Sequence, residues 1–115
     1  MTREELVRRI IERTAERKLI EMGFSGLELE EVPLEIVKCT HLTKLWLNNN
    51  QITQISEVLG QLFNLTWLSL SNNQITSIPE VLGQLSNLRW LELDGNQITS
   101  IPEALRQLPN LKIYE

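Results

Sequence analysis

The chain has 115 residues, of which 42% are apolar and 23% are charged, and its formal net charge is −4. This length predicts one domain over residues 1–115, and this composition is that of a folded protein rather than a disordered one. The acidic balance argues against nucleic-acid binding, which requires a basic surface.

The first segment predicts a helix over residues 2–17. Thr2 followed three residues later by Glu5 is a capping-box pattern, which satisfies backbone N–H groups where a helix begins. One apolar stripe then recurs at helical spacing: Leu6, Val7, Ile10, Ile11 and Ala15. We expect this helix to cover the first unit of the repeat array that follows it. The alternative is a membrane-surface helix, because basic residues outnumber acidic ones here, but the interspersed glutamates disfavour it.

A leucine recurs at a strict spacing of 23 residues, at Leu42, Leu65, Leu88 and Leu111. Three complete units therefore cover residues 42–64, 65–87 and 88–110. Each contains L-x-x-L-x-L-x-x-N-x-I, the pattern of leucine-rich repeats. Residues 19–41 fit the same pattern in degenerate form, and residues 111–115 begin a further, truncated unit.

Two periodicities lie within each unit. At its start leucines such as Leu45 and Leu47 alternate with polar or aromatic residues, which is strand spacing. Later apolar residues recur three and four positions apart, while Gly60 and Gly83 favour short 3-10 turns over long helices. The sequence therefore predicts an α/β solenoid of the leucine-rich-repeat class. It has a curved parallel β-sheet on the concave face, short 3-10 or helical arms on the convex face, and an N-terminal capping helix.

An asparagine stands in each complete unit where the strand passes into the loop: Asn50, Asn73 and Asn96. Because it recurs at the repeat period, we interpret it as a structural ladder whose side-chain amides satisfy backbone groups. Contact with a ligand is the alternative. Leu27 takes this position in the degenerate unit, as fits a terminal repeat.

Strand alternation turns the leucines inward and places the residues between them on the concave face. At the 23-residue pitch they form three columns, which read Glu21, Lys44, Trp67, Trp90, Ile113, then Gly23, Trp46, Ser69, Glu92, Glu115, then Ser25, Asn48, Ser71, Asp94. All three tryptophans of the chain fall on this face. Exposed aromatic clusters usually mark interaction sites, whereas rings that only support the sheet by stacking are the alternative.

The concave face is therefore predicted to bind a protein or peptide. The predicted contact residues are Lys44, Trp46, Asn48, Trp67, Ser69, Ser71, Trp90, Glu92, Asp94 and Ile113. Acidic side chains flank the indoles, so the expected partner is apolar with a basic rim. A second hypothesis is a homodimer formed through the last strand, where Leu111, Ile113 and Tyr114 lie on an edge with unpaired backbone groups.

Residues suited to catalysis or metal binding are sparse. His41 stands where the other units have asparagine, and Cys39 stands where they have leucine, so we interpret both as structural. One histidine and one cysteine cannot supply a metal site of ordinary N/S ligand count, and no phosphate-binding glycine motif occurs. We predict no enzyme, no cofactor and no metal. The lone cysteine, the absence of a signal-peptide core and the absence of a membrane-spanning run predict a cytoplasmic protein without membrane contact.

The 23-residue units are similar to cytosolic leucine-rich repeats of bacteria and of Ras-pathway scaffold proteins. The opening, from Thr2-Arg-Glu-Glu-Leu6 into Leu27-Glu-Leu-Glu-Glu-Val-Pro33, resembles the N-terminal repeat domain of bacterial Roco proteins. There a short helix precedes a degenerate repeat, and the repeats precede a GTPase and dimerisation module that no segment here matches. The resemblance implies a recognition module, which we expect to be an N-terminal fragment of a longer repeat protein. A third hypothesis is the recognition arm of a Roco-type GTPase whose catalytic module is absent.

Overall fold

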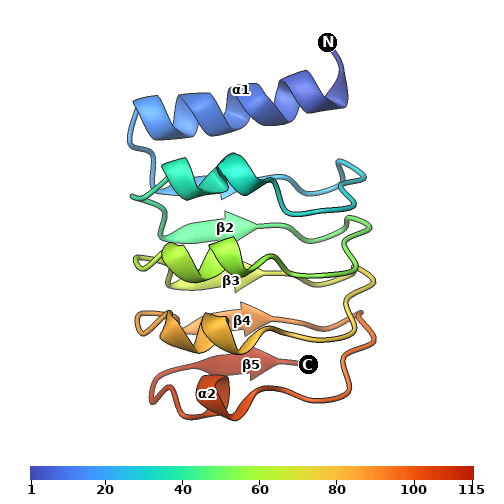
Figure 1. Cartoon of the computed structure of the whole chain (residues 1–115), viewed down its shortest axis with the longest axis vertical. Coiled ribbons are helices and arrows are strands. Elements are labelled where there is room, and N and C mark those ends of the chain that lie inside the picture. The colour runs from blue at the N-terminus through green and yellow to red at the C-terminus, as the bar shows by residue number, and fades with distance from the viewer.

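The computed structural model describes residues 1–115 and shows a solenoid of 40 × 26 × 18 Å (Figure 1). Helix α1 (Arg3–Glu16) lies across one end, and the later turns stack away from it. One five-stranded parallel sheet contains, in chain order, β1 (Glu21–Gly23), β2 (Lys44–Trp46), β3 (Trp67–Ser69), β4 (Trp90–Glu92) and β5 (Lys112–Tyr114).

Four short helical arms cover the other side of the solenoid. They are the 3-10 helices η1 (Leu34–Lys38), η2 (Glu57–Gln61) and η3 (Glu80–Gln84), and the one-turn α-helix α2 (Glu103–Arg106). The arms pack closely, because a Cβ atom on Gly60 in η2 would lie only 2.8 Å from Cγ2 of Val81 in η3. The predicted leucine-rich-repeat solenoid with a parallel sheet, 3-10 arms and an N-terminal helix is confirmed.

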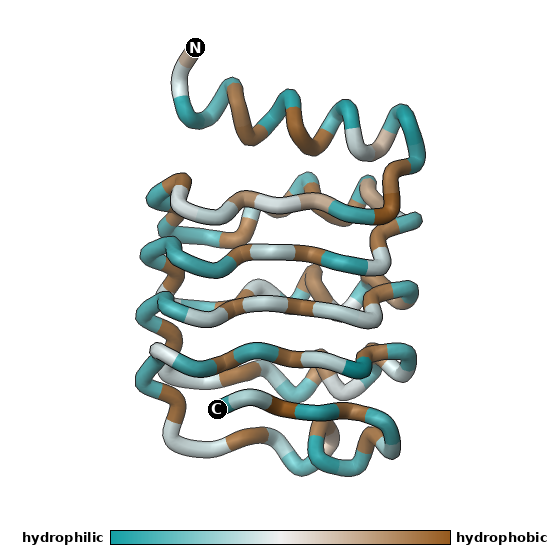
Figure 2. Tube along the Cα trace, turned by 180° about the vertical axis from the view of Figure 1, so that it is seen from behind, coloured by the Kyte–Doolittle hydropathy of each residue, from teal (hydrophilic) through white to brown (hydrophobic).

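Leucine and isoleucine side chains fill the space between the sheet and the arms. Leu45, Leu68 and Leu91, at the centres of three neighbouring strands, are each 0% exposed. Apolar positions recur at matching places in successive turns (Figure 2). Each fully buried side chain of this kind contributes roughly 1.5–3 kcal/mol, so the stacked rows are the main stabilising element of the fold.

The asparagine ladder joins neighbouring turns. Oδ1 of Asn73 accepts a hydrogen bond from the N–H of Ile52 at 3.0 Å, and its Nδ2 donates to the carbonyl oxygens of Leu47 and Leu70, each at 3.0 Å. Leu47 and Ile52 belong to the preceding turn, so one amide satisfies backbone groups of two turns. Asn50 and Asn96 make equivalent bonds. These are the hydrogen bonds expected of a structural ladder.

The residue before each ladder position has a left-handed backbone. Its φ is +71° at Gly26, +59° at Asn49, +57° at Asn72 and +72° at Gly95. Glycine and asparagine tolerate this conformation best. At Gly95 a Cβ atom would also meet Oδ1 of Asn72, so the Asn72 side chain would have to move to admit it. The turn that ends each strand is therefore specified by two adjacent residues, not by the ladder asparagine alone.

Helix α1 packs on the first turn through one face. Thr2 caps its start by accepting a hydrogen bond from the N–H of Glu5 at 3.1 Å. Val7, Ile11 and Thr14 are buried. The predicted helix over 2–17 is thus observed as Arg3–Glu16, with a capping residue on either side.

The fifth strand departs from the 23-residue register. β5 pairs Lys112 with Trp90, Ile113 with Leu91 and Tyr114 with Glu92, so one residue fewer separates these partners than in the preceding strand pair. Side chains alternate between the two faces of a strand, so a shift of one residue moves each of them to the other face. The prediction that Ile113 lies on the concave face is therefore wrong. It occupies the inward row beside Leu91 and is half-buried.

Candidate protein-binding face

The sheet register brings the predicted concave residues together. Lys44, Trp67 and Trp90 are successive partners across β2, β3 and β4. In the next column Trp46, Ser69 and Glu92 are successive partners in the same way. The column arrangement predicted for β1 to β4 is observed.

Trp67 and Trp90 form an aromatic pair. Their ring centroids are 5.3 Å apart and their planes are inclined by 32°, a separation typical of favourable aromatic contacts. Nζ of Lys44 lies 5.9 Å from the Trp67 ring centroid and 3.9 Å from the Glu21 carboxylate. A cation at this distance from an indole face is attracted by the ring. Lysine, indole and indole thus stack along one column.

The three indoles are half-buried rather than fully exposed. Trp46 lies beside β1, because a Cβ atom on Gly23 would be 3.7 Å from Cβ of Trp46 and 3.8 Å from its Cε3. Support from neighbouring strands therefore fixes each ring, while part of its surface stays open to solvent. The rings therefore support the sheet, as the stacking alternative expects, and they also present apolar surface, while binding through them stays a prediction.

Ser69 cannot contact a partner in this structure. Its exposure is 1%, although it lies in a concave column. Its register partners are the larger side chains Trp46 and Glu92, which stand on either side of it. Its Oγ lies 3.4 Å from Oγ of Ser71, which is half-buried. The prediction of Ser69 as a contact residue is therefore wrong.

The indole N–H of Trp67 is buried and has no hydrogen-bond partner. Leaving such a donor unpaired costs about 1–3 kcal/mol. The ring is held by contacts on its faces rather than by this polar group.

Carboxylates border the indoles on one side. Glu92 is half-buried and Asp94 is exposed, and neither forms an ion pair. Asn48, in the same column as Asp94, is half-buried and accepts a hydrogen bond from Oγ of Ser25 at 2.9 Å. The face is therefore apolar at its centre with free negative charge near β4.

Two concave residues were missed by the sequence prediction. Lys112 takes the position beside Trp90, and Tyr114 takes the position beside Glu92 where Glu115 was expected. The signal lies in the spacing, since Leu111 and Ile113 are two residues apart whereas Leu88 and Leu91 are three apart. Glu115 instead forms an ion pair with Arg106 at 3.7 Å.

Groups suited to chemistry are not brought together. No set of three histidine, cysteine, aspartate or glutamate side chains is placed to hold a metal ion. His41 is exposed, with Oγ1 of Thr40 at 3.4 Å. Cys39 is buried, and this burial raises the pKa of its thiol. The helices are all too short or too polar to cross a membrane.

The family model for leucine-rich repeats matches residues 40–98 and 64–113. The chain belongs to the leucine-rich-repeat family. It is similar to a leucine-rich-repeat protein of Leptospira interrogans, with 27% identity and a TM-score of 0.65 over 90% of this chain and 33% of that one. It is also similar to internalin C2 of Listeria monocytogenes, with 32% identity and a TM-score of 0.73 over 86% of this chain and 42% of that one.

This leucine-rich-repeat chain spans less than half the length of either structural relative. No curated protein sequence gives a significant match to it. Leucine-rich-repeat proteins generally act as protein-interaction scaffolds and are typically non-enzymatic. The resemblance to Roco proteins and the cytoplasmic location stay predictions.

Proposed function

We propose that the chain is a non-enzymatic recognition module that binds a protein or peptide on its concave sheet through Trp46, Trp67 and Trp90. The observation that carries this proposal is the gathering of all three tryptophans on one side of one sheet. The contact between the half-buried rings of Trp67 and Trp90, whose centroids are 5.3 Å apart, supports it, because the pair presents apolar surface on that face.

The arrangement of the rings suits binding energetically. Tryptophan is enriched among residues that dominate binding free energies, because a large apolar area is desolvated at once. Trp67 and Trp90 are already fixed against each other, and Lys44 lies against the Trp67 ring. Ordering them on binding therefore costs little conformational entropy.

The charges beside the indoles define the expected partner. Glu92 and Asp94 have no basic partner within the chain, so a Lys or Arg side chain of the partner would complement them. Tyr114 is 46% exposed and extends the apolar surface at β5. We infer a partner segment with an apolar side chain for the indoles and a basic residue next to it.

A peptide library displayed on phage tests this proposal, because it samples many partner sequences at once. Peptides are selected on the immobilised protein, and their affinities are measured by calorimetry. Trp67→Ala combined with Trp90→Ala should lower the affinity by at least about 30-fold, because the loss of even one hot spot costs roughly 2 kcal/mol or more. Phe63→Ala is the matched control, since Phe63 is an aromatic residue outside the sheet with 59% exposure. Unchanged affinity in the folded tryptophan variant would contradict the proposal.

A second candidate function is self-association through β5. This strand pairs with β4 alone, and Tyr114 is exposed on it. An unpaired strand edge is a template for another strand. Sedimentation would then show a concentration-dependent dimer that survives Trp67→Ala/Trp90→Ala and is lost in Tyr114→Lys, because a charge on an edge strand opposes pairing. A monomer at all concentrations would exclude this candidate.

A further inference from the structure

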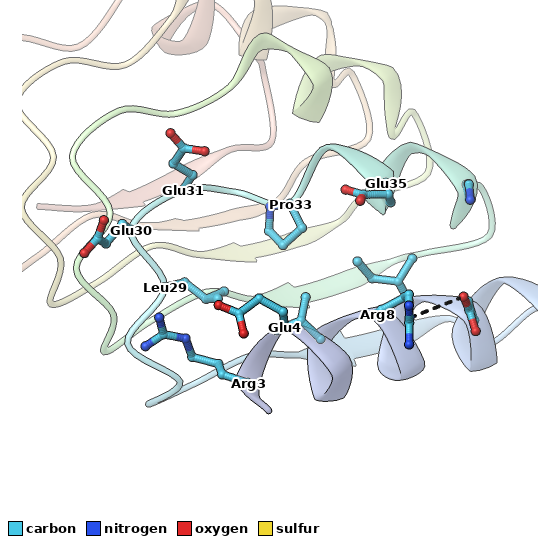
Figure 3. Close-up of a pocket in the computed structure, with 12 residues that line it drawn as sticks. Arg3, Glu4, Arg8, Leu29, Glu30, Glu31, Pro33 and Glu35 are labelled. Carbon is cyan, nitrogen blue, oxygen red and sulfur yellow. Dashed lines mark ion pairs between the residues drawn. The ribbon is translucent and has the colours of Figure 1, made fainter. Parts of the chain in front are cut away.

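A groove of about 470 Å³ lies between α1 and the segment 29–38 that follows β1 and contains η1 (Figure 3). Arg3, Glu4 and Arg8 project from α1, and Glu30, Glu31, Pro33 and Glu35 lie along the opposite wall (Figure 3). None of the concave residues described above lines it. It is therefore a separate surface from the tryptophan face, and inferences about it do not depend on the proposed function.

The floor of the groove is apolar. Val7, Ile11 and Leu29 line it, and half-buried Pro33 adjoins them. Val7 and Leu29 keep 8% and 9% of their surface exposed, whereas Leu45 in the interior repeats keeps 0%. A side chain entering the groove would remove this remaining apolar surface from water.

The rim of the groove carries unpaired negative charge. Glu4, Glu30, Glu31 and Glu35 are exposed, and none of them forms an ion pair. The arginines of the rim are already engaged by other glutamates. Arg3 pairs with Glu28 at 3.3 Å, and Arg8 pairs with Glu12 at 3.9 Å. Lys38 is the one basic side chain of the lining without such a partner.

We propose that this groove binds a cationic, amphipathic peptide segment. An apolar side chain of the segment lies on Val7 and Leu29, and its Arg or Lys side chains pair with Glu30 and Glu31. The volume falls within the range of about 300–1,000 Å³ typical of ligand sites. Carboxylates and guanidinium groups form strong, charge-assisted hydrogen bonds. An acidic segment would be repelled by the unpaired carboxylates of Glu4, Glu30, Glu31 and Glu35.

The binding test uses a fluorescein-labelled peptide of alternating arginine and leucine, followed by fluorescence anisotropy. A peptide with glutamate in place of arginine is the ligand control. The basic peptide should bind, the acidic one should not, and added salt should weaken the binding because it screens exposed charges. Backbone amide NMR shifts should change in α1 and residues 29–38, while tryptophan emission stays constant.

Charge reversal separates the groove from general attraction to an acidic protein. Glu30→Lys with Glu31→Lys should lower the affinity at least about tenfold, because two attractions become repulsions. Glu57→Lys with Glu80→Lys changes the net charge equally on the exposed arms η2 and η3 and should leave the affinity unchanged. Circular dichroism checks that both variants fold.

Three outcomes would overturn the groove proposal. They are no binding of the basic peptide, equal losses in the two double variants, and shift changes centred on β2 to β4 with altered tryptophan emission. The last of these leaves the concave-face proposal intact. Failure of the concave-face experiment likewise leaves the groove proposal intact.

Discussion

The interfaces between repeats and the interface beneath α1 are built differently. Between repeats the arms lie so close that Gly60 has no room for a Cβ atom beside Val81, and each ladder asparagine bonds to the preceding turn. At the other interface the α-helix α1, with three buried residues, packs against the arm that contains the short 3-10 helix η1. A groove of about 470 Å³ remains between them. Similar units stack with their arms in close contact, whereas the cap, which has another geometry, leaves a groove beside the first arm.

This difference has a thermodynamic consequence. In a solenoid each unit contacts only its neighbours, so the stability is approximately a sum over interfaces. We expect the interface under α1 to be the weakest and to open first, because local unfolding begins where few apolar contacts are buried. Substitutions in the two kinds of interface should therefore differ in their effect on stability.

Truncating a buried side chain in each region is the most direct comparison. Leu68→Ala in β3 should lower the free energy of unfolding by about 3–5 kcal/mol, because a fully buried leucine leaves a cavity. Val7→Ala in α1 removes less volume from a site that already borders an open groove, so its loss should be less than half as large. Urea denaturation measures both. Equal losses would mean that the cap is as tightly integrated as the repeats.

Removing one rung of the ladder tests the polar part of the repeat interface. Asn73→Ala should cost about 2–4 kcal/mol, since it leaves the buried N–H of Ile52 and the carbonyls of Leu47 and Leu70 without their partner. Asn64→Ala is the control. It removes one exposed hydrogen bond, to the carbonyl of Thr40, and should cost below about 1 kcal/mol. Thermal unfolding in which the two variants match would refute the structural role of the ladder.

Adding a methyl group between two arms tests the closeness of their packing. Gly60→Ala should destabilise the fold by about 1–3 kcal/mol, because its Cβ would meet Val81. Combining it with Val81→Ala should restore part of this loss. A Gly60→Ala protein as stable as the wild type would show that the arms can move apart.

A substitution at the C-terminal end of α1 should give a small gain in stability. Lys18 has a φ of +53°, and the N–H groups of Leu19 and Lys18 donate to the carbonyls of Thr14 and Ala15, which is a Schellman arrangement. Lys18→Gly should raise the stability by about 0.5–1 kcal/mol, because glycine adopts this backbone without strain. Differential scanning calorimetry would reveal a higher Tm. A lower Tm would show that the lysine side chain contributes more than its backbone costs.

The 23-residue period of the sequence predicts the features that recur in every unit and misses those that differ between units. The strands β1 to β4, the inward leucines and the asparagine ladder follow from the 23-residue spacing, because stacking forces equivalent residues into rows. The register of β5 was mispredicted because Leu111 and Ile113 are one residue closer together than Leu88 and Leu91.

Other features depend on the sizes of neighbouring side chains. The burial of Ser69 follows from the bulk of its neighbours across the sheet, which its own position in the pattern does not specify. The groove beneath α1 arises where two unlike elements meet, and no spacing within either of them encodes it. Sequence reasoning therefore located the columns of the candidate binding face on β2 to β4 but misplaced Ser69 and the residues of β5.

Tryptophan fluorescence tests the central claim most directly, because every tryptophan of the chain lies on the concave face. Acrylamide quenching is measured for the free protein and for its complex with a peptide selected on it. A peptide that lies on the sheet should shield the half-buried indoles and lower the quenching constant. A peptide that binds with full occupancy and leaves the quenching constant unchanged would contradict the account.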